Sequence, residues 1–171
     1  MSFTLPADAE LSEATRAALA TVPPLNVFRM VARAPTSLPP FIQLARSILT
    51  GSELSPRMRE LAVLRVTHLA GSSYAYQQHV QLAKLVGLTD PDIAAASSDL
   101  AGLDAAGALA CQVAEEITLS VRLSDDTLAR AVAMFGQRQA TELVLACSYF
   151  NMVARFLEST RVPLDLLGGR S

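Results

Sequence analysis

Apolar residues recur at helical spacing along almost the whole chain. Residues three, four and seven positions apart share one face of an α-helix, whereas strands need apolar and polar residues to alternate. No sustained alternation of Val, Ile, Thr and aromatic residues occurs in the sequence. The pattern therefore predicts an all-α fold, with helices near residues 8–21, 25–33, 37–50, 56–70, 73–86, 90–98, 104–121, 125–135 and 138–159.

Capping residues mark the ends of several of these helices. Ser55 stands before a proline, which suits an N-cap followed by the first helical position. Thr89 and Ser124 are candidate N-caps of two further helices, and Gly87 and Gly136 suit the position just after a helix.

Length and composition indicate one domain covering residues 1–171. Hydrophobic residues make up 51% of the 171 residues and charged residues only 18%, which is enough apolar material for a sizeable core. Two proline-rich stretches break residues 1–37 into short pieces. We expect this segment to wrap around a helical core formed by residues 38–167.

The charge pattern argues against two classes of partner. The net charge is −2 and the basic residues are scattered singly, so neither nucleic acid nor a membrane is expected as a partner. No apolar run approaches the roughly 18 residues of a membrane span, and the first residues lack the features of a signal peptide. We expect a soluble, cytoplasmic protein.

The two cysteines, Cys111 and Cys147, both lie in apolar surroundings. Such settings are typical of buried free thiols in a reducing compartment rather than of a disulfide. The sequence predicts that both thiols are inert.

Residues 57–69 are apolar on most of the helix circumference, which predicts a buried helix. Glu60 lies on this helix, and a buried carboxylate must be paired, hydrogen-bonded or protonated. Glu60 is therefore a candidate general acid or base. The alternative is an ordinary ion pair with Arg57, with Arg65 or with an arginine of the C-terminal helix.

On the next predicted helix, His79 lies in an apolar stripe and should point inward. A single histidine on an apolar face is more often a packed core residue than a catalyst, and both interpretations stay open. Tyr74, Tyr76 and Gln78 come from the same short helix and could line a pocket beside His79. Packing at the edge of the core is the alternative for these three residues.

The segment from Glu60 to His79 resembles the active-site segment of the carboxymuconolactone decarboxylase and alkylhydroperoxidase D superfamily. Peroxidase-type members carry a Glu, a Cys-x-x-Cys pair and then a His four residues after the second cysteine. Here Glu60, Ser72, Ala75 and His79 occupy those positions. Because Ser and Ala cannot supply a thiolate, the resemblance points to a thiol-free branch and away from thiol peroxidase chemistry.

The resemblance extends from about residue 38 to residue 167 and implies an alkylhydroperoxidase-D-like helical domain. The pattern over residues 71–79 looks like a thiol-free branch in which an acidic residue and a tryptophan usually fill the positions of Ala75 and Tyr76. Residues 142–155 are similar to the last long helix of the family, with Tyr149 as its tyrosine. The resemblance places Glu60 and His79 in the proton-relay positions.

Family likeness also implies a homo-oligomer, either a trimer or a hexamer. The positive mean hydropathy and the scarcity of charged residues agree with such an assembly. A site shared between subunits would draw on the last helix, where Tyr149, Asn151 and Arg155 are candidates. Capping or surface pairing is the alternative for Asn151 and Arg155.

Motifs for other chemistries are missing from the sequence. It contains no nucleotide-binding glycine motif and no Gly-x-Ser-x-Gly. The two histidines, His68 and His79, are eleven residues apart, which is not a recognised metal-ligand spacing. Nothing orients Ser72 or Ser73 as a nucleophile toward His79. We expect neither a metal nor a cofactor.

Three functions remain open on this evidence. The first is a cofactor-free lyase or isomerase that acts on a small carboxylated or lactone-like substrate. His79 would be its proton donor, Glu60 the partner or base, and Tyr74 or Tyr76 an oxyanion donor, with Ser72, Gln78 and Tyr149 as further substrate contacts. The second is an antioxidant peroxidase that uses Cys111 or Cys147. The third is a non-enzymatic binding or scaffold protein.

Overall fold

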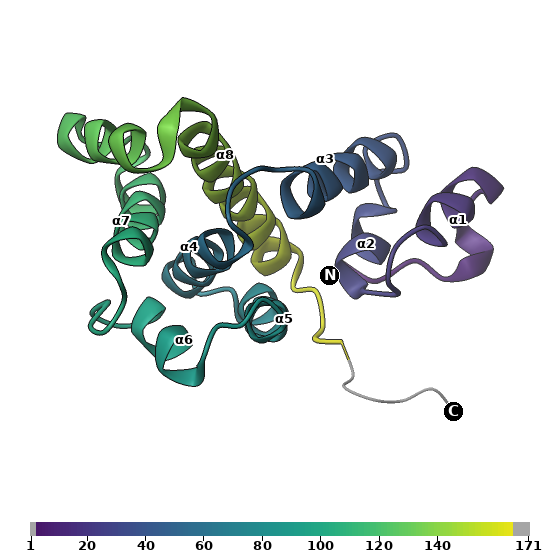
Figure 1. Ribbon diagram of the computed structural model, residues 1–171. Coiled ribbons are helices and arrows are strands. Elements are labelled where there is room, and N and C mark those ends of the chain that lie inside the picture. Colours follow the sequence, from purple (N-terminus) through teal and green to yellow (C-terminus); the bar gives the residue numbers. More distant parts are fainter. Residues whose placement is uncertain (1–2, 166–171) are drawn as a thin grey trace.

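The computed structural model describes residues 3–165, and this range is built from helices without any strand (Figure 1). The prediction of an all-α fold is confirmed. The elements are a 3-10 helix η1 (Asp8–Glu10) and eight α-helices: α1 (Glu13–Leu19), α2 (Asn26–Val31), α3 (Leu38–Thr50), α4 (Pro56–Leu69), α5 (Ser73–Leu85), α6 (Asp90–Ala96), α7 (Ala105–Ser120) and α8 (Asp125–Thr160).

Helix α4 forms the centre of the core, as its apolar circumference predicts. It packs against α7, α5 and α8, and these helices surround it in Figure 1. Every residue from Met58 to Thr67 is buried, including the charged residues Arg59, Glu60 and Arg65. A charged group in this helix therefore has to find its partner inside the protein.

Helices α7 and α8 pack along one another beside α4. The side chains of Asp104 and Ser124 cap their N-termini by accepting backbone N–H groups. Gly136 has φ +75° and interrupts α8, which confirms the predicted break after residue 135. Gly87, with φ +87°, likewise follows the end of α5. Glycine adopts this left-handed backbone without the steric penalty that a Cβ would add.

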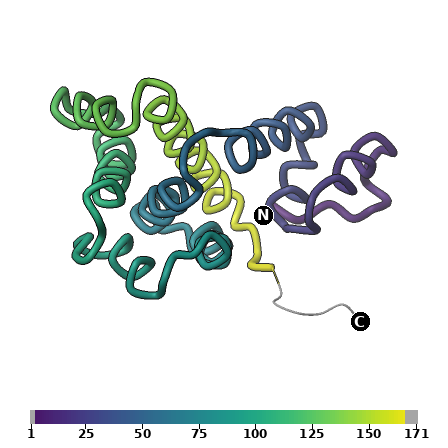
Figure 2. The backbone as a smooth tube through the Cα atoms, viewed as in Figure 1, coloured from purple at the N-terminus to yellow at the C-terminus, as the bar shows by residue number. Residues whose placement is uncertain are grey.

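The N-terminal helices lie at one end of the molecule, on the outer side of α3 (Figures 1 and 2). Both α1 and α2 pack against α3, and a small apolar cluster there includes Leu11, Val31 and Leu38. Val27 and Met30 of α2 also reach the main core. Helix α2 is thereby held where it can form one wall of a cavity.

The segment after α8 runs back between α5 and α2 (Figure 2). Asn26 donates from Nδ2 to the Pro163 carbonyl at 3.0 Å, and its backbone N–H donates to Oδ1 of Asp165 at 2.8 Å. The other carboxylate oxygen of Asp165 accepts from the Tyr74 hydroxyl and, at 3.1 Å, from Nε2 of Gln78. One carboxylate thus ties α2 to α5.

No helix within residues 3–165 combines the length and the apolar character needed to cross a bilayer.

Candidate active site

A buried carboxylate and a buried imidazole meet between α4 and α5. Oε2 of Glu60 lies 2.7 Å from Nδ1 of His79, and Oε1 of Glu60 accepts from Nε of Arg59 at 3.0 Å. The Glu60 side chain is fully buried, and His79 is only 5% exposed. Each carboxylate oxygen therefore has a partner that can carry positive charge, as a buried carboxylate requires.

The surroundings of Glu60 favour its ionised form. Burial raises the pKa of this carboxyl, but the hydrogen bonds and positive charge of His79 and Arg59 together outweigh burial and leave the pKa below its ordinary value. An ionised carboxylate only accepts hydrogen bonds. Nδ1 of His79 is therefore the donor, and the second ring nitrogen, Nε2, is left for other chemistry.

The arginine beside Glu60 is not one of those considered from the sequence. Arg57 pairs with Asp92 and Asp104, and Arg65 pairs with Glu115. Arg59 is the next residue in the chain, and adjacent side chains on a helix point about 100° apart, so periodicity gave no reason to pair them. The buried helix did give a reason to expect this pairing, because Arg59 on a helix without a solvated face needs a partner inside the protein.

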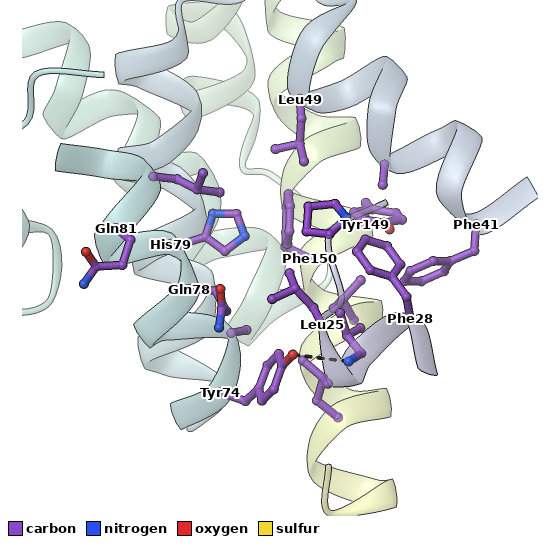
Figure 3. Close-up of a pocket in the computed structure, with 17 residues that line it drawn as sticks. Leu25, Phe28, Phe41, Leu49, Tyr74, Gln78, His79, Gln81, Tyr149 and Phe150 are labelled. Atoms are coloured by element: carbon purple, nitrogen blue, oxygen red, sulfur yellow. Dashed lines mark hydrogen bonds between the residues drawn. The ribbon is translucent and has the colours of Figure 1, made fainter. Parts of the chain in front are cut away.

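His79 lies in the wall of a cavity of about 390 Å³ (Figure 3). Its imidazole projects from α5 toward Phe150, and the two ring centroids are 4.5 Å apart at an edge-to-face angle of 81°. No residue between 3 and 165 hydrogen-bonds Nε2. The cavity is lined by Pro23, Leu25, Val27, Phe28, Phe41, Ala45, Leu49, Tyr74, Ala75, Gln78, His79, Gln81, Leu82, Tyr149, Phe150, Val153 and Leu157.

Tyr149 brings a neutral hydroxyl to this cavity from α8. Its ring packs against Phe41 and Phe150, with centroid distances of 5.6 and 5.1 Å. Burial raises the pKa of Tyr149 above its ordinary value, so the phenol keeps its proton. Among the described residues none hydrogen-bonds this hydroxyl, and burial is the one cause of its pKa shift. A neutral O–H at this position can donate to an oxygen of a bound molecule.

Two other predicted contacts from α5 line the same cavity but already have partners. The Tyr74 hydroxyl donates to Asp165 and accepts from the backbone N–H of Val27 at 3.2 Å. Burial and then the Asp165 carboxylate raise the pKa of Tyr74. Gln78 donates to Asp165 as well. The Tyr74 hydroxyl therefore has no donor left for a ligand, whereas Gln78 uses one N–H and keeps its second N–H and its Oε1.

Tyr76 and Ser72 lie outside the cavity lining. The hydroxyls of Tyr76 and Ser97 are hydrogen-bonded at 2.8 Å, and the Tyr76 ring lies near the exposed His68. Ser72 is buried at the N-terminus of α5, and its hydroxyl has no partner among the described residues. The structure thus brings together Glu60, His79, Tyr74, Gln78 and Tyr149 but not the other two.

Asp165 and the aromatic side chains Phe28, Phe41 and Phe150 are parts of the site that the sequence analysis did not single out. Phe28 and Phe41 come from the N-terminal third, and Asp165 is 91 residues from Tyr74 in the chain. Helical spacing relates only residues within a few turns of each other. Phe150 could have been found from the sequence, because it directly follows Tyr149 in the segment resembling the last helix of the family.

Both cysteines are sealed inside the protein, as their apolar settings predict. Cys111 and Cys147 are free thiols with no exposed surface. Burial raises the pKa of Cys111 to about 12 and raises that of Cys147 as well. A thiol that stays protonated at neutral pH is a poor nucleophile toward peroxide. In residues 3–165 no group of three or more His, Cys, Asp or Glu side chains is placed to hold a metal ion.

Residues 35–116 match the model of the carboxymuconolactone decarboxylase family, and Glu60 and His79 both lie inside this range. Over this range the chain is similar to the carboxymuconolactone decarboxylase family. The matched range runs from just before α3 into α7 and so contains the complete α4–α5 pair.

Solved structures of other proteins share the fold of this chain. A peroxidase-related protein from Ralstonia eutropha JMP134, described as an alkylhydroperoxidase AhpD core, has a TM-score of 0.83 at 15% identity over 96% of this chain and 92% of that one. A peroxidase-related protein from Silicibacter sp. TM1040 has a TM-score of 0.81 at 21% identity over the same shares of the two chains.

A protein of unknown function from Agrobacterium tumefaciens, named as a candidate antioxidant defence protein AhpD, is similar over 80% of this chain and 96% of that one. Its TM-score is 0.74 at 16% identity. At these identities the three structures establish the fold of this chain and not its reaction. No curated protein matches the sequence significantly.

Proposed function

We propose that this protein is a cofactor-free acid/base enzyme, a lyase or isomerase that moves a proton at a carbon next to a carbonyl group. The observation that carries the proposal is the Glu60–His79 pair, whose imidazole lines a cavity large enough for a small organic molecule. A buried carboxylate that orients an imidazole is the arrangement in which histidine acts as a general base and then as a general acid.

The geometry suggests a division of roles. Glu60 accepts a hydrogen bond from Nδ1–H of His79. The lone pair of Nε2 is then available to remove a proton from a carbon α to a carbonyl. The electrons pass to the carbonyl oxygen as an enolate, and the Glu60 carboxylate stabilises the imidazolium. The new Nε2–H then returns the proton to a different carbon of the same molecule, which completes an isomerisation. In a decarboxylation, protonated His79 would instead deliver its proton to the carbanion left by loss of carbon dioxide.

An enolate needs a hydrogen-bond donor, and Tyr149 fits this role better than the tyrosines expected from the sequence. The Tyr74 hydroxyl donates to Asp165, and the Tyr76 hydroxyl is hydrogen-bonded to Ser97. Tyr149 lines the cavity, and its hydroxyl keeps its proton and has no hydrogen-bond partner among the described residues. A neutral donor aimed at developing negative charge stabilises the transition state more than the ground state.

Thiol peroxidase chemistry has little support in this chain. Two structural neighbours are named as peroxidase-related, but the name belongs to those proteins. Here Ser72 and Ala75 stand at the dithiol positions, and both cysteines are buried with raised pKa values. A purely structural protein would have no need for an imidazole at a cavity wall, so the acid/base proposal takes precedence over the scaffold alternative.

Isomerisation of a butenolide tests the proposal directly. A methyl-substituted β,γ-unsaturated γ-lactone, here called the methyl butenolide, absorbs more strongly in the ultraviolet when its double bond moves into conjugation. In heavy water, proton removal also introduces deuterium at the α-carbon, which NMR detects. The test panel consists of this lactone and the same ring carrying a carboxymethyl group, the carboxymethyl butenolide.

We expect the wild-type protein to accelerate exchange or isomerisation of at least one panel member above the buffer rate. His79→Ala should lower that rate roughly a hundred- to ten-thousand-fold. The matched control is His68→Ala, because His68 is the other histidine of the chain, is exposed and does not line the cavity. Full activity of a folded His79→Ala variant, or no rate above buffer for any panel member, would contradict the proposal.

A further inference from the structure

We infer that the molecule held in the cavity is uncharged: an apolar, ring-sized carbonyl compound rather than a carboxylate. This inference rests on the proposed acid/base function and narrows its substrate class. Of the two substrate types considered from the sequence, it retains the lactone-like type and removes the carboxylated one.

The lining of the cavity contains no charged side chain. Twelve of the seventeen lining residues are wholly apolar, and the remaining five are Tyr74, Gln78, His79, Gln81 and Tyr149. No lysine or arginine is among them. Sites for carboxylates in proteins usually supply an arginine fork or a lysine, because a carboxylate that loses its hydration without a partner is strongly disfavoured.

The charges just behind the lining make the site less favourable for an anion. Glu60 lies behind His79, and Asp165 lies behind Tyr74 and Gln78, so two carboxylates flank the cavity. Arg59, a buried cation, is already paired with the Glu60 carboxylate. A third carboxylate placed in the cavity would meet repulsion from both sides, with only the imidazole available to offset it.

Two arginines on the helices that form the cavity wall have hydrogen-bond partners outside the cavity. Arg46 follows the lining residue Ala45 on α3, but its guanidinium donates to the carbonyl of Thr21. Arg29 on α2 donates to Pro6 and Asp8. Neither arginine lines the cavity.

Shape and chemistry both favour a neutral ring. Phe28, Phe41, Tyr149 and Phe150 give the cavity aromatic walls, and its volume of about 390 Å³ suits a small cyclic molecule. Aromatic rings bind apolar surface well and prefer edge-to-face or offset contacts. A neutral carbonyl compound carries no charge in the ground state and becomes negative only as the enolate forms. Tyr149 and His79 then act mainly on the transition state.

Binding to the full-length protein tests this inference separately from catalysis. The affinities of the methyl butenolide and the carboxymethyl butenolide are measured by calorimetry on wild-type protein and on His79→Ala. We expect the neutral lactone to bind at least ten-fold more tightly than the carboxylated one to wild-type protein, and to keep measurable binding to His79→Ala. Equal or tighter binding of the carboxylated lactone by wild-type protein would overturn the inference.

Two outcomes separate this inference from the proposed function. If the neutral lactone binds preferentially but neither lactone is turned over, the substrate class stands and the proposed function fails. If the carboxylated lactone is turned over by a His79-dependent reaction and binds more tightly, the function stands and the substrate class is wrong.

A charge-insertion variant provides a positive test of the same argument. Leu82 lines the cavity and is 36% exposed, so an arginine there has room to keep its guanidinium partly hydrated. We expect Leu82→Arg to raise the affinity for the carboxymethyl butenolide at least ten-fold, whereas the matched neutral variant Leu82→Gln does not. An unchanged affinity of a folded Leu82→Arg variant would show that missing positive charge is not what disfavours anions, and would overturn the inference.

Discussion

At the scale of single residues, the properties of the site depend on the carboxylate of Glu60. It is fully buried and accepts from both Arg59 and His79. Its pKa in the folded protein is lower than the ordinary value of 4.5, because those two partners outweigh the effect of burial. A lowered folded-state pKa stabilises the protein above the unfolded pKa, and this stabilisation is lost as the pH falls through the folded value.

The first prediction concerns acid stability. Glu60→Gln should lower the free energy of unfolding at neutral pH by about 3–5 kcal/mol, because it leaves the buried Arg59 without its charged partner. The difference from wild type should be largest above the ordinary Glu60 pKa of 4.5 and should shrink as the pH falls below it. Urea unfolding at a series of pH values measures both quantities. The exposed Glu158→Gln on α8 is the control, and a pH-independent difference for Glu60→Gln would contradict the argument.

The second prediction concerns the thiols. Cys111 and Cys147 are fully buried, and burial raises both pKa values, that of Cys111 to about 12. We expect a thiol reagent such as Ellman's to label neither cysteine within minutes in the native protein and both in denaturant. The variant with both cysteines replaced by alanine should consume hydrogen peroxide no more slowly than wild type. Rapid native labelling, or a peroxidase rate that the double variant loses, would restore the thiol mechanism.

At the scale of the helices, the site depends on how α5 is held between α4 and the C-terminal segment. Asp165 receives three donors, from Asn26, Tyr74 and Gln78, and so joins two helices that form opposite parts of the cavity wall. Hydrogen bonds to a charged acceptor are stronger than neutral ones. We therefore treat Asp165 as the residue that holds α2 against α5 beside the cavity.

The third prediction follows from that contact. Asp165→Ala should lower the free energy of unfolding by about 2 kcal/mol and increase amide hydrogen exchange in residues 26–31 and 73–78. Asp165→Asn retains one oxygen acceptor and should show a smaller effect on both measurements. Unchanged exchange in α2 for the alanine variant would show that Asp165 does not hold these helices together.

The helices show how far sequence patterns reach. The buried helix α4, the break at Gly136 and the inward direction of His79 follow from local spacing and glycine chemistry, and these predictions are confirmed. Spacing could not choose among the tyrosines, because all three lie on partly apolar helix faces and only tertiary contacts decide which hydroxyl is free. The left-handed end of α7 at Val121, φ +67°, also had no sequence signal, since β-branched residues rarely adopt it.

At the scale of the whole molecule, the outer face of α8 lacks the charge expected of a solvated surface. Positions Thr141, Leu145, Ser148 and Met152 follow one another at helical spacing and are all exposed, with Leu145 at 46% and Met152 at 48%. Arg155 continues this row, but its guanidinium bonds back to Asn151 in the same helix. A charge-poor stripe with exposed Leu and Met is typical of a surface that a partner covers.

The fourth prediction is that copies of this chain cover the α8 stripe. Light scattering during size-exclusion chromatography should give a mass of three or six times 18.2 kDa, in line with the expected trimer or hexamer. Replacing both Leu145 and Met152 with glutamate should lower that mass, because each new charge would have to be buried without a partner. The same double change at the exposed positions Leu82 and Leu85 of α5 should leave the mass unaltered. A wild-type mass of 18.2 kDa at micromolar concentration would mean that the stripe faces water and that the cavity is built from one chain alone.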